Sequence, residues 1–559
     1  MPENDPHDLD DHDLDDHDLD DRPGDPVVLE TWLGAPALSY ARRPATVLDV
    51  LDRAVRRFPT RTAFVDVDGT SVSYADFAAR VQTAADALLA EPLPRGSCVA
   101  VASGNTLDLA TAVFACARAH LVMVGLNTRL APPQWAWMLE HSRVQLSLAG
   151  PDYLADLPGA RPLGAFLRSA PARTWAYDPD RHEPADHEPD RPAQDAAYAV
   201  VYTSGTTGRP KASQVVHRAS VHSGMSYQRV LQLGPADVTA VLFPMYYISA
   251  MHAHVLPAML AGATCVLVDT VSPRAYVALL AEHQVSWAYA VPSWWRLCLR
   301  DSNFRDLPAL TRLAAGGAPF PADLVAALRE RLPGVRLHDV YGLSETHSPG
   351  CIATDEDLRA HPGSVGRPLD CLQAEVRGDD RAPLPAGEAG QLWLRGSLVT
   401  TGYAFDEPAT AAAIVDGWFN TGDIARLDPE GRVTILDRSK DMINRGGTKI
   451  FSAEVEEVLR RHPGIEDAAV VGVPDALAGE SVAAFVIARA PLTAALLTAA
   501  PLTAADVRGW VRDQMADYAS PKIVELVDEL PRNAVGKTDK QALRARVASD
   551  TRPSSRVET

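Results

Sequence analysis

Residues 202–213 read YTSGTTGRPKAS and follow directly on the apolar stretch 197–201, AYAVV. Gly205 and Gly208 allow the backbone to turn tightly and to approach a ligand closely. Backbone amides, hydroxyl groups and a positive charge at the end of a strand make a cradle for a phosphate. The hydroxyls and the charge come from Thr203, Ser204, Thr206, Thr207 and Lys211. The segment therefore predicts a phosphate-binding loop.

The loop differs from the Walker pattern, in which a Gly-Lys-Ser/Thr triplet ends the loop and opens a helix. Here Pro210 precedes Lys211, and Ala212 follows it. An ordinary P-loop ATPase is therefore not indicated. A Gly/Ser/Thr-rich stretch of this length can also be a loop that binds nothing, so its function depends on what the rest of the chain contains.

At 559 residues the chain is long enough for two or more domains, and its 47% hydrophobic and 22% charged residues are typical of a soluble globular protein. The chain has no cationic start followed by an apolar segment and no 18-residue apolar run, so neither secretion nor a membrane span is predicted. The six cysteines lack CxxC or histidine spacing, which favours buried, reduced thiols over disulfides or a zinc site. A cytoplasmic enzyme is the default expectation.

The net charge of −19 is concentrated at the amino terminus. Residues 1–25 contain twelve acidic residues and one arginine, including three HDLDD repeats at 7–11, 12–16 and 17–21. Such a segment is too polar to bury a core, so a disordered tail over residues 1–26 is predicted. Binding of a divalent cation by its His and Asp side chains is a less favoured alternative. No basic stripe occurs in the chain, so no nucleic-acid partner is expected.

Helical and strand patterns alternate through most of the chain. Helices are expected at 47–58, 74–89 and 107–119, and strands at 62–67, 98–102, 239–243, 263–268 and 286–291. Such alternation predicts an α/β fold with mostly parallel sheets covered by helices and ligand loops at the carboxyl ends of the strands. The phosphate-binding loop follows a strand, as this rule requires.

The pattern changes near residues 437–441. Beyond that point a helix is expected at 452–461, strands at 467–473 and 482–488, another helix near 505–516, and a further element at 522–527. The domains expected are a large one over 27–437 and a small α+β domain over 438–547, followed by a tail at 548–559. Residues 173–196 and a repeated APLTAA at 490–495 and 500–505 are expected to be surface connections.

Further motifs follow the phosphate-binding loop: YGLSET at 341–346, TGD at 421–423, LDRSKDMINRGGTKI at 436–450 and PRNAVGKTDK at 531–540. Together with GLNTRLAPPQWAWML at 125–139, they resemble, in order and spacing, the acyl-adenylate-forming (AMP-binding, ANL) superfamily, which includes acyl-CoA synthetases and aryl-acid adenylating enzymes. The resemblance runs from about residue 30 to residue 547. It implies a large amino-terminal α/β domain and a small, mobile carboxyl-terminal domain.

The resemblance also implies a role for each motif in binding ATP. The loop would hold the β- and γ-phosphates, Thr346 would contact the α-phosphate and Glu345 would bind Mg²⁺. Asp423 would accept hydrogen bonds from the ribose hydroxyls, assisted by Arg438, because both carboxylate oxygens are acceptors. The remaining AMP-binding residues implied by the resemblance are Gly317, Ala318, Pro319, Asp339, Val340, Tyr341 and Gly342.

The resemblance implies two roles for the small domain. Lys537 matches a mobile lysine that lies between the carboxylate and the α-phosphate, where an ammonium offsets the repulsion between two anions. Lys440 matches the hinge about which the small domain turns between adenylation and thiolation. After that rotation, Gly446 and Gly447 would line the channel for the acceptor thiol.

The substrate is predicted less closely than the reaction. By resemblance, Tyr246, Tyr247, Met251 and Gly316 line the acyl pocket, and their surroundings favour an apolar or aromatic carboxylic acid. An α-amino acid is disfavoured, because residues 246–254 include no aspartate to bind an amine.

The acceptor and the assembly state stay open. YGLSET and the GGAP of residues 316–319 resemble acyl-CoA synthetases, whereas INRGGTKI at 443–450 resembles enzymes that load a carrier protein. CoA is the expected acceptor because CoA synthetases are the commoner members of the family that the chain resembles, and a carrier-protein phosphopantetheine or another nucleophile is the alternative. A non-catalytic adenylate-binding protein is disfavoured, because all the catalytic side chains are present. The oligomeric state is not predicted, and a homodimer is one arrangement that stays open.

Overall fold

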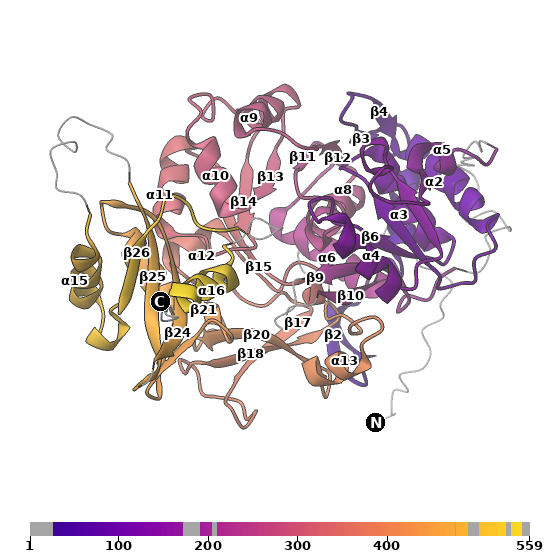
Figure 1. Cartoon of the computed structure of the whole chain (residues 1–559). Coiled ribbons are helices and arrows are strands. Elements are labelled where there is room, and N and C mark those ends of the chain that lie inside the picture. The colour runs from indigo at the N-terminus through magenta and orange to yellow at the C-terminus, as the bar shows by residue number, and fades with distance from the viewer. Residues whose placement is uncertain are drawn as a thin grey trace, which may run out of the picture.

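The computed structural model describes residues 26–171, 191–203, 210–475, 477–489, 502–532 and 538–550. Several predicted features lie outside these ranges: the acidic repeats, most of the 173–196 connection, most of the APLTAA repeats, and the site residues Ser204, Gly205, Thr206, Thr207, Gly208 and Lys537. The described part is an α/β structure with mixed, mostly parallel sheets and a separate carboxyl-terminal domain, so the expected fold class is confirmed (Figure 1).

The first large sheet has six strands in the order β10-β9-β6-β5-β7-β8, and only β10 is antiparallel to its neighbour. Its strands are β5 (Cys98–Ala102), β6 (Val122–Gly125), β7 (Leu146–Ala149), β8 (Arg161–Pro162), β9 (Ala197–Thr203) and β10 (Lys211–Val216). Along β5, Val99 and Val101 face one core and Cys98 and Ala100 face another. The sheet is therefore buried on both faces, as its continuous apolar strands require.

The second large sheet has eight strands in the order β16-β15-β14-β13-β11-β12-β3-β4, antiparallel only at its two edges. The strands are β3 (Thr62–Val65), β4 (Ser71–Ser73), β11 (Val238–Val241), β12 (Thr264–Leu267), β13 (Trp287–Ala290), β14 (Arg312–Gly316), β15 (Arg336–Tyr341) and β16 (Cys351–Ala353). On β13, Trp287 and Tyr289 face the core shared with the first sheet, whereas Ala288 and Ala290 face the outer helices.

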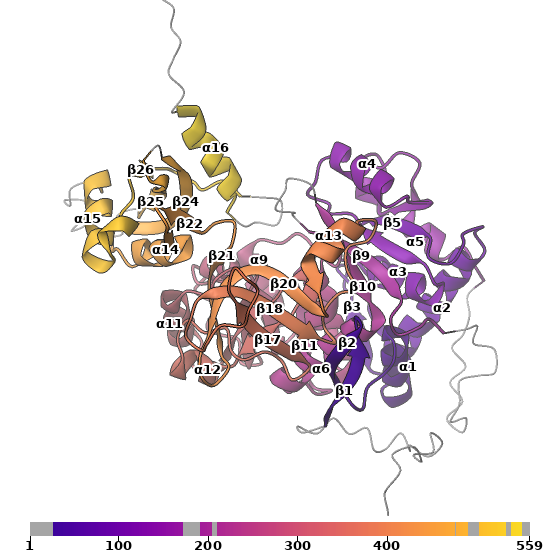
Figure 2. The same ribbon diagram turned by 90° about the horizontal axis from the view of Figure 1, so that it is seen from below.

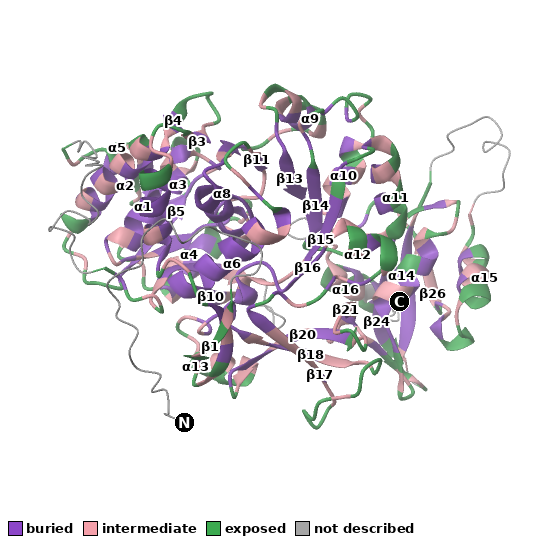
Figure 3. Ribbon diagram, turned by 180° about the vertical axis from the view of Figure 1, so that it is seen from behind, coloured by how far each residue is buried: buried purple, intermediate pink, exposed green. Residues whose placement is uncertain are grey.

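Helices fill the space between the two sheets and cover their outer faces. The shared core contains α1 (Val47–Arg57), α2 (Tyr74–Leu89), α3 (Leu107–Arg118), α6 (His217–Leu231) and α8 (Leu256–Ala261), and the strands beside it are buried (Figure 3). The outer face of the first sheet carries α4 (Pro132–His141). The outer face of the second carries α9 (Pro273–Glu282), α10 (Pro292–Cys298), α11 (Ala322–Arg331) and α12 (Asp355–Ala360).

A third, antiparallel sheet connects the large sheets to the carboxyl-terminal domain. It consists of β17 (Leu372–Arg377), β18 (Gly390–Gly396), β19 (Ile414–Val415), β20 (Trp418–Leu427) and β21 (Val433–Arg438). The hairpin of β1 (Val27–Trp32) and β2 (Ala35–Tyr40) packs beside it. Short elements complete this part: α5 (Leu163–Leu167), α7 (Ile248–Ala250), α13 (Glu407–Ala413), the 3₁₀ turns η1 (Pro151–Tyr153) and η3 (Ser344–Thr346), and a π-helical turn, η2 (Met251–Val255).

The carboxyl-terminal domain has its own sheet and its own cores, and it stands to one side of the rest of the molecule in Figure 2. Its elements are β22 (Ile443–Arg445), β23 (Thr448–Ile450), α14 (Ser452–Arg460), β24 (Ile465–Asp475), β25 (Gly479–Ala488), α15 (Ala504–Gln514), the 3₁₀ turn η4 (Asp517–Ala519), β26 (Ile523–Leu526) and α16 (Lys540–Asp550).

The structure agrees with several expectations from local sequence. All six cysteines are buried and free. Within the described ranges, no helix is both long enough and apolar enough to cross a membrane. The helix starts at 47, 74 and 107 are as predicted, because a Thr or Ser side chain caps each first turn from Thr46, Ser73 and Thr106.

Candidate active site

The predicted nucleotide residues lie at the carboxyl ends of two neighbouring parallel strands. Gly316, at the end of β14, is paired in register with Val340 of β15. Residues 317–319 leave β14 and residues 342–346 leave β15, so both segments emerge at one edge of the sheet. This is the position at which parallel α/β sheets bind ligands. Gly317, Ala318 and Pro319 are exposed there, whereas Asp339 and Val340 are buried beneath them.

Asp423 joins three of the predicted motifs. It lies on β20 opposite Arg438 of β21. Its Oδ1 is 2.7 Å from Nε of Arg438, and its Oδ2 accepts a 2.6 Å hydrogen bond from the hydroxyl of Tyr341. The carboxylate is 2% exposed, whereas the Arg438 side chain is 42% exposed. The structure therefore brings YGLSET, TGD and LDR together, and a carboxylate keeps further lone pairs for a ligand hydroxyl.

Glu345 is a buried carboxylate on η3, directly after β15. Its Oε1 accepts a 2.9 Å hydrogen bond from the hydroxyl of Tyr403. Burial raises the pKa of Glu345, while that hydrogen bond and the charges of Arg438 and Lys211 act in the opposite direction. Glu345 is therefore a buried acceptor on which a hydrogen-bond donor and nearby positive charges already act.

Tyr403 is a site residue that sequence reasoning missed. It lies in the segment 400–404, which runs beside β10: Ala404 N donates to Ala212 O at 2.8 Å, and Gln214 N donates to Gly402 O at 3.0 Å. This register places the Tyr403 ring under Lys211, whose Nζ is 4.7 Å from the ring centroid. Thr203, at the end of β9, pairs with Lys211 across the strands. The described ends of the phosphate-binding loop therefore lie beside Glu345.

Thr346 is fully buried, and its hydroxyl is already engaged. It donates to Leu343 O at 3.1 Å and accepts from Leu343 N at 3.0 Å. A hydroxyl has only one hydrogen to donate. For the α-phosphate to receive it, the hydroxyl has to turn away from Leu343 O, so the role of Thr346 stays a prediction.

The residues expected in the acyl pocket differ in exposure. Tyr246 is buried and packs closely on Gly125. A Cβ added to Gly125 would lie 2.8 Å from the Cβ of Tyr246. Tyr247 is half-buried, and its hydroxyl accepts a 2.7 Å hydrogen bond from the amide of Asn127. Met251 is buried at the start of the π-helical turn, a feature common near functional sites. Tyr247 is therefore the more accessible of the two tyrosines.

Gly316 has no room for a side chain. A Cβ at this position would lie 2.4 Å from the Tyr289 hydroxyl and 2.5 Å from the backbone oxygen of Val340. Because the backbone oxygen belongs to the paired strand, we expect Gly316→Ala to lower the free energy of unfolding by about 1–3 kcal/mol. Chemical denaturation measures this loss. Gly509→Ala, in α15 with open space around it, is the matched control and is expected to be neutral or stabilising.

Asp339, one of the predicted AMP-binding residues, is expected to make stability depend on pH. Burial raises its pKa from 3.8 to about 8. The folded state therefore holds the proton more tightly than the unfolded chain does, and this contribution to stability, full below about pH 4, is lost as the pH rises to about 8. In Asp339→Asn the side chain does not titrate, so this loss of stability with rising pH does not occur. The Tm of this variant relative to the parent is expected to rise by about 2 °C or more between pH 5 and pH 8.5. A constant difference in Tm across that range would contradict the assignment.

The hinge residue Lys440 is exposed and lies between two anchored segments. On one side, Ser439 N donates to Gly422 O at 2.9 Å. On the other, Arg544 of α16 donates to Lys440 O at 3.3 Å and to Asp441 Oδ1 at 2.7 Å. Lys440 thus lies where β21 leads into the carboxyl-terminal domain, and its role as the hinge stays a prediction.

The predicted thiol-channel glycines are not packed against the site. Gly446 and Gly447 form the turn between β22 and β23, both with positive φ, and a Cβ on either would meet nothing within 4 Å. The domain is instead held by Phe451, packed on Ile424 and Leu436, and by the Ser452 amide, which donates to Asp437. The space beside these two glycines is therefore open in this arrangement.

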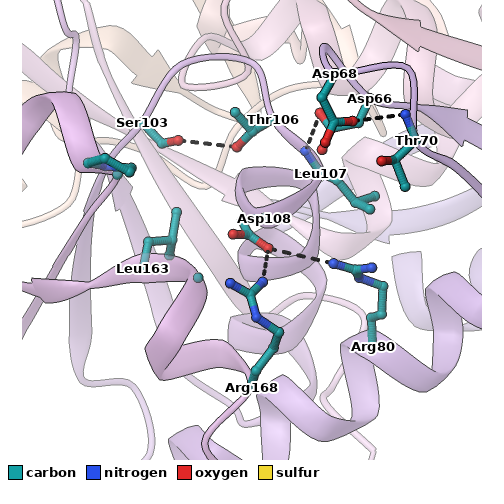
Figure 4. Close-up of a pocket in the computed structure, with 13 residues that line it drawn as sticks. Asp66, Asp68, Thr70, Arg80, Ser103, Thr106, Leu107, Asp108, Leu163 and Arg168 are labelled. Atoms are coloured by element: carbon teal, nitrogen blue, oxygen red, sulfur yellow. Dashed lines mark hydrogen bonds and ion pairs between the residues drawn. The ribbon is translucent and has the colours of Figure 1, made fainter.

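A separate cavity of about 280 Å³ lies away from these motifs, at the carboxyl ends of β3, β5 and β7 (Figure 4). Its charged groups are already paired: Asp108 lies 2.9 Å from Arg168 and 3.9 Å from Arg80, and Asp66 accepts from Leu107 N at the start of α3. None of the motif residues lines it. We therefore place the active site at the ends of β14 and β15.

Comparison with known proteins places the chain in the class of AMP-forming acid–CoA ligases. The family model of AMP-binding enzymes matches residues 51–404, and the model of their carboxyl-terminal domain matches residues 454–537. The first of these covers more than half of the chain. The chain therefore belongs to the family of AMP-binding enzymes.

Known proteins of this family resemble the chain over nearly its whole length. A feruloyl-CoA synthase from Amycolatopsis is 33% identical over 501 residues, which cover 88% of this chain and 97% of that protein. An indoleacetate–CoA ligase from Aromatoleum aromaticum is 30% identical over 510 residues, 90% and 98% of the two chains. The solved o-succinylbenzoate CoA synthetase of Bacillus subtilis, with its acyl-adenylate intermediate, superposes with a TM-score of 0.77 at 27% identity, over 89% and 97% of the chains.

Proposed function

We propose that the protein converts an apolar or aromatic carboxylic acid to its acyl-adenylate with ATP and transfers the acyl group to the thiol of CoA. The observation that carries this proposal is the convergence of Tyr341, Asp423, Arg438 and Glu345 on the strand ends where nucleotides bind in such sheets. The names of the related proteins, which are CoA ligases and synthetases, support the acceptor.

In this proposal each side chain acts mainly by position and charge, as in other nucleotidyl and phosphoryl transfers. Asp423 would accept hydrogen bonds from the ribose hydroxyls, while Arg438 and Tyr341 hold its two oxygens in place. Lys211, the first residue of β10, would neutralise part of the phosphate charge. Lys537 would approach the α-phosphate from the carboxyl-terminal domain, and Lys440 would be the hinge that carries it there and away again.

The residues present fit a Mg²⁺ ion bound together with ATP. Such ions take one or two protein carboxylates, and the remaining ligands are phosphate oxygens and water. Glu345 is a single buried carboxylate next to the described end of the phosphate-binding loop. We propose that Glu345 holds this ion, which supplies charge neutralisation to the triphosphate when it is bound.

The class of carboxylic acid is proposed from the side chains of the predicted acyl pocket. Tyr247 and Phe243 are half-buried in front of the second sheet, and the Phe243 ring meets the Tyr289 ring at 4.7 Å. No acidic residue occurs between Tyr246 and His254, so an ammonium group on the substrate would have no partner from this segment. Aromatic rings and apolar side chains favour a flat or aliphatic acyl group.

The experiment that tests this function is pyrophosphate release by the purified protein with a panel of hydroxycinnamic, arylacetic, medium-chain and branched acids, each with and without CoA. Turnover that depends on one class of acid and on CoA is the expected result. Adenylation that depends on the acid but is not accelerated by CoA would move the acceptor to a carrier-protein phosphopantetheine or another nucleophile. No release of pyrophosphate with any acid would favour a non-catalytic adenylate-binding protein.

A further inference from the structure

We propose that Tyr403 is a positioning residue that sets Glu345 and Lys211 for the metal-bound triphosphate, the hydroxyl acting on the carboxylate and the ring face on the ammonium. The hydroxyl donates to Glu345 Oε1 at 2.9 Å, and Lys211 Nζ lies 4.7 Å from the ring centroid. One side chain therefore contacts both charged groups on which triphosphate binding depends in the proposed function, and the inference rests on that function.

The backbone holds Tyr403 at this position. Its amide donates to the Thr410 hydroxyl at 2.9 Å, and an isolated β-bridge joins Tyr403 to Ser213 of β10. The residue is 8% exposed, so its ring has little freedom to leave. Glu345 is anchored to the same segment, because Thr400 N donates to Glu345 O at 2.8 Å. The segment 400–403 thus fixes the position of Glu345 from both its main chain and its side chain.

The two contacts do different work. A hydroxyl that donates to one carboxylate oxygen fixes the carboxylate rotamer and directs the other oxygen toward a ligand. The ring face attracts the ammonium through its quadrupole and limits where it can point. Removing the hydroxyl should therefore affect the metal, whereas removing the ring should also affect the contact of Lys211 with the phosphates.

The simpler reading is that Tyr403 only fills space, with its hydroxyl satisfied by a nearby acceptor. Tyr198 on β9 offers a control for that reading, because it is a buried tyrosine whose hydroxyl donates to Ser220 Oγ at 2.9 Å. Loss of either hydroxyl removes one buried hydrogen bond, but of these two tyrosines only Tyr403 bonds to a carboxylate at the site.

The test measures ATP binding, by calorimetry and by the rise in Tm on adding ATP, across a range of Mg²⁺ concentrations. Tyr403→Phe is expected to raise the Mg²⁺ concentration for half-maximal ATP binding about fivefold to tenfold, with ATP affinity at saturating Mg²⁺ changed less than twofold. Tyr403→Leu is expected to show the same shift and to weaken ATP binding at saturating Mg²⁺ by a further threefold or more. Tyr198→Phe is expected to shift neither quantity.

Two further variants locate any failure. Glu345→Asp keeps the charge but shortens the side chain away from the Tyr403 hydroxyl, and it is expected to raise the Mg²⁺ requirement as Tyr403→Phe does, without adding to it in the double variant. In a Lys211→Met background, Tyr403→Phe and Tyr403→Leu are expected to bind ATP equally at saturating Mg²⁺.

If Glu345→Asp raises the Mg²⁺ requirement and Tyr403→Phe does not, the role of Tyr403 is overturned while the metal role of Glu345 stands. If neither variant changes the Mg²⁺ requirement, the proposed metal site is wrong and the inference fails with it. If Tyr403→Phe does not fold, the double variant of Glu345→Asp and Tyr403→Leu replaces it. Additive effects of these two substitutions on the Mg²⁺ requirement would overturn the proposal that Tyr403 acts through Glu345.

Discussion

Asp423→Ala is expected to lower kcat/KM for ATP by about 10²-fold to 10³-fold, which corresponds to about 3–4 kcal/mol. The substitution removes the proposed acceptor of the ribose hydroxyls. It also releases the Tyr341 hydroxyl and the Arg438 guanidinium from their 2.6 Å and 2.7 Å contacts. The Arg438 side chain is 42% exposed, so water takes over part of the lost interaction and the protein should still fold.

Asp428 provides the matched control for Asp423. It lies in the turn between the same two strands and also pairs with an arginine, Arg432, at 2.8 Å, but it is far more exposed. Asp428→Ala is expected to cost less than about 1 kcal/mol of stability and to leave ATP binding unchanged. Steady-state kinetics and calorimetric ATP titrations compare the two variants. Equal ATP affinities would show that Asp423 does not bind the nucleotide.

Local patterns predicted much of the framework around the site, but not the strands β14, β15, β20 and β21 that carry it. The apolar runs of β11, β13 and β24 and the capped helices α1 to α3 came out close to their expected bounds, because burial periodicity and capping are written in neighbouring residues. That YGLSET lies close to TGD and LDR was expected only from the resemblance, because no local pattern brings β15 near β20, which belongs to another sheet. The structure supplies the contact itself, through the Tyr341 hydroxyl and Asp423.

Tyr403 shows what local patterns leave out. The stretch TTGYAFD at 400–406 contains no acidic, basic or glycine-rich motif that would mark its tyrosine as part of a site. Its place beside Lys211 depends on backbone hydrogen bonds to β10, nearly two hundred residues earlier in the chain. Tyr246 is a second case: its expected place in the acyl pocket stays a prediction, and its burial against Gly125 followed from no local pattern. Long-range register decides both outcomes, and a single sequence does not encode register in any local pattern.

The carboxyl-terminal domain presents the stem of the segment that contains Lys537. The described ends of this segment are held together, since Asp539 N donates to Pro531 O at 2.7 Å and a β-bridge joins Arg532 to Thr538. Asp539 then caps the first turn of α16, whose Leu543 packs in the domain core. Residues from 538 onward therefore belong to the carboxyl-terminal domain, and in the proposed function the hinge at Lys440 would decide where Lys537 is presented.

Lys537→Ala is accordingly expected to reduce acid-dependent ATP–pyrophosphate exchange by about 10³-fold, because a single charge placed where two anions approach is worth several kcal/mol in the transition state. ATP affinity should change by less than about threefold, since the lysine acts in the transition state more than in the ground state. Thioester formation from supplied acyl-adenylate and CoA should persist, because in the proposed function the domain turns and takes the lysine out of the site before the second half-reaction. Lys522→Ala removes an exposed lysine of the same domain, paired with Asp475 at 2.6 Å, and should leave both half-reactions intact. Exchange that survives in Lys537→Ala would mean that another group neutralises the charge at the α-phosphate. An equal loss in both half-reactions would mean that the lysine stabilises the domain and does not take part in its chemistry.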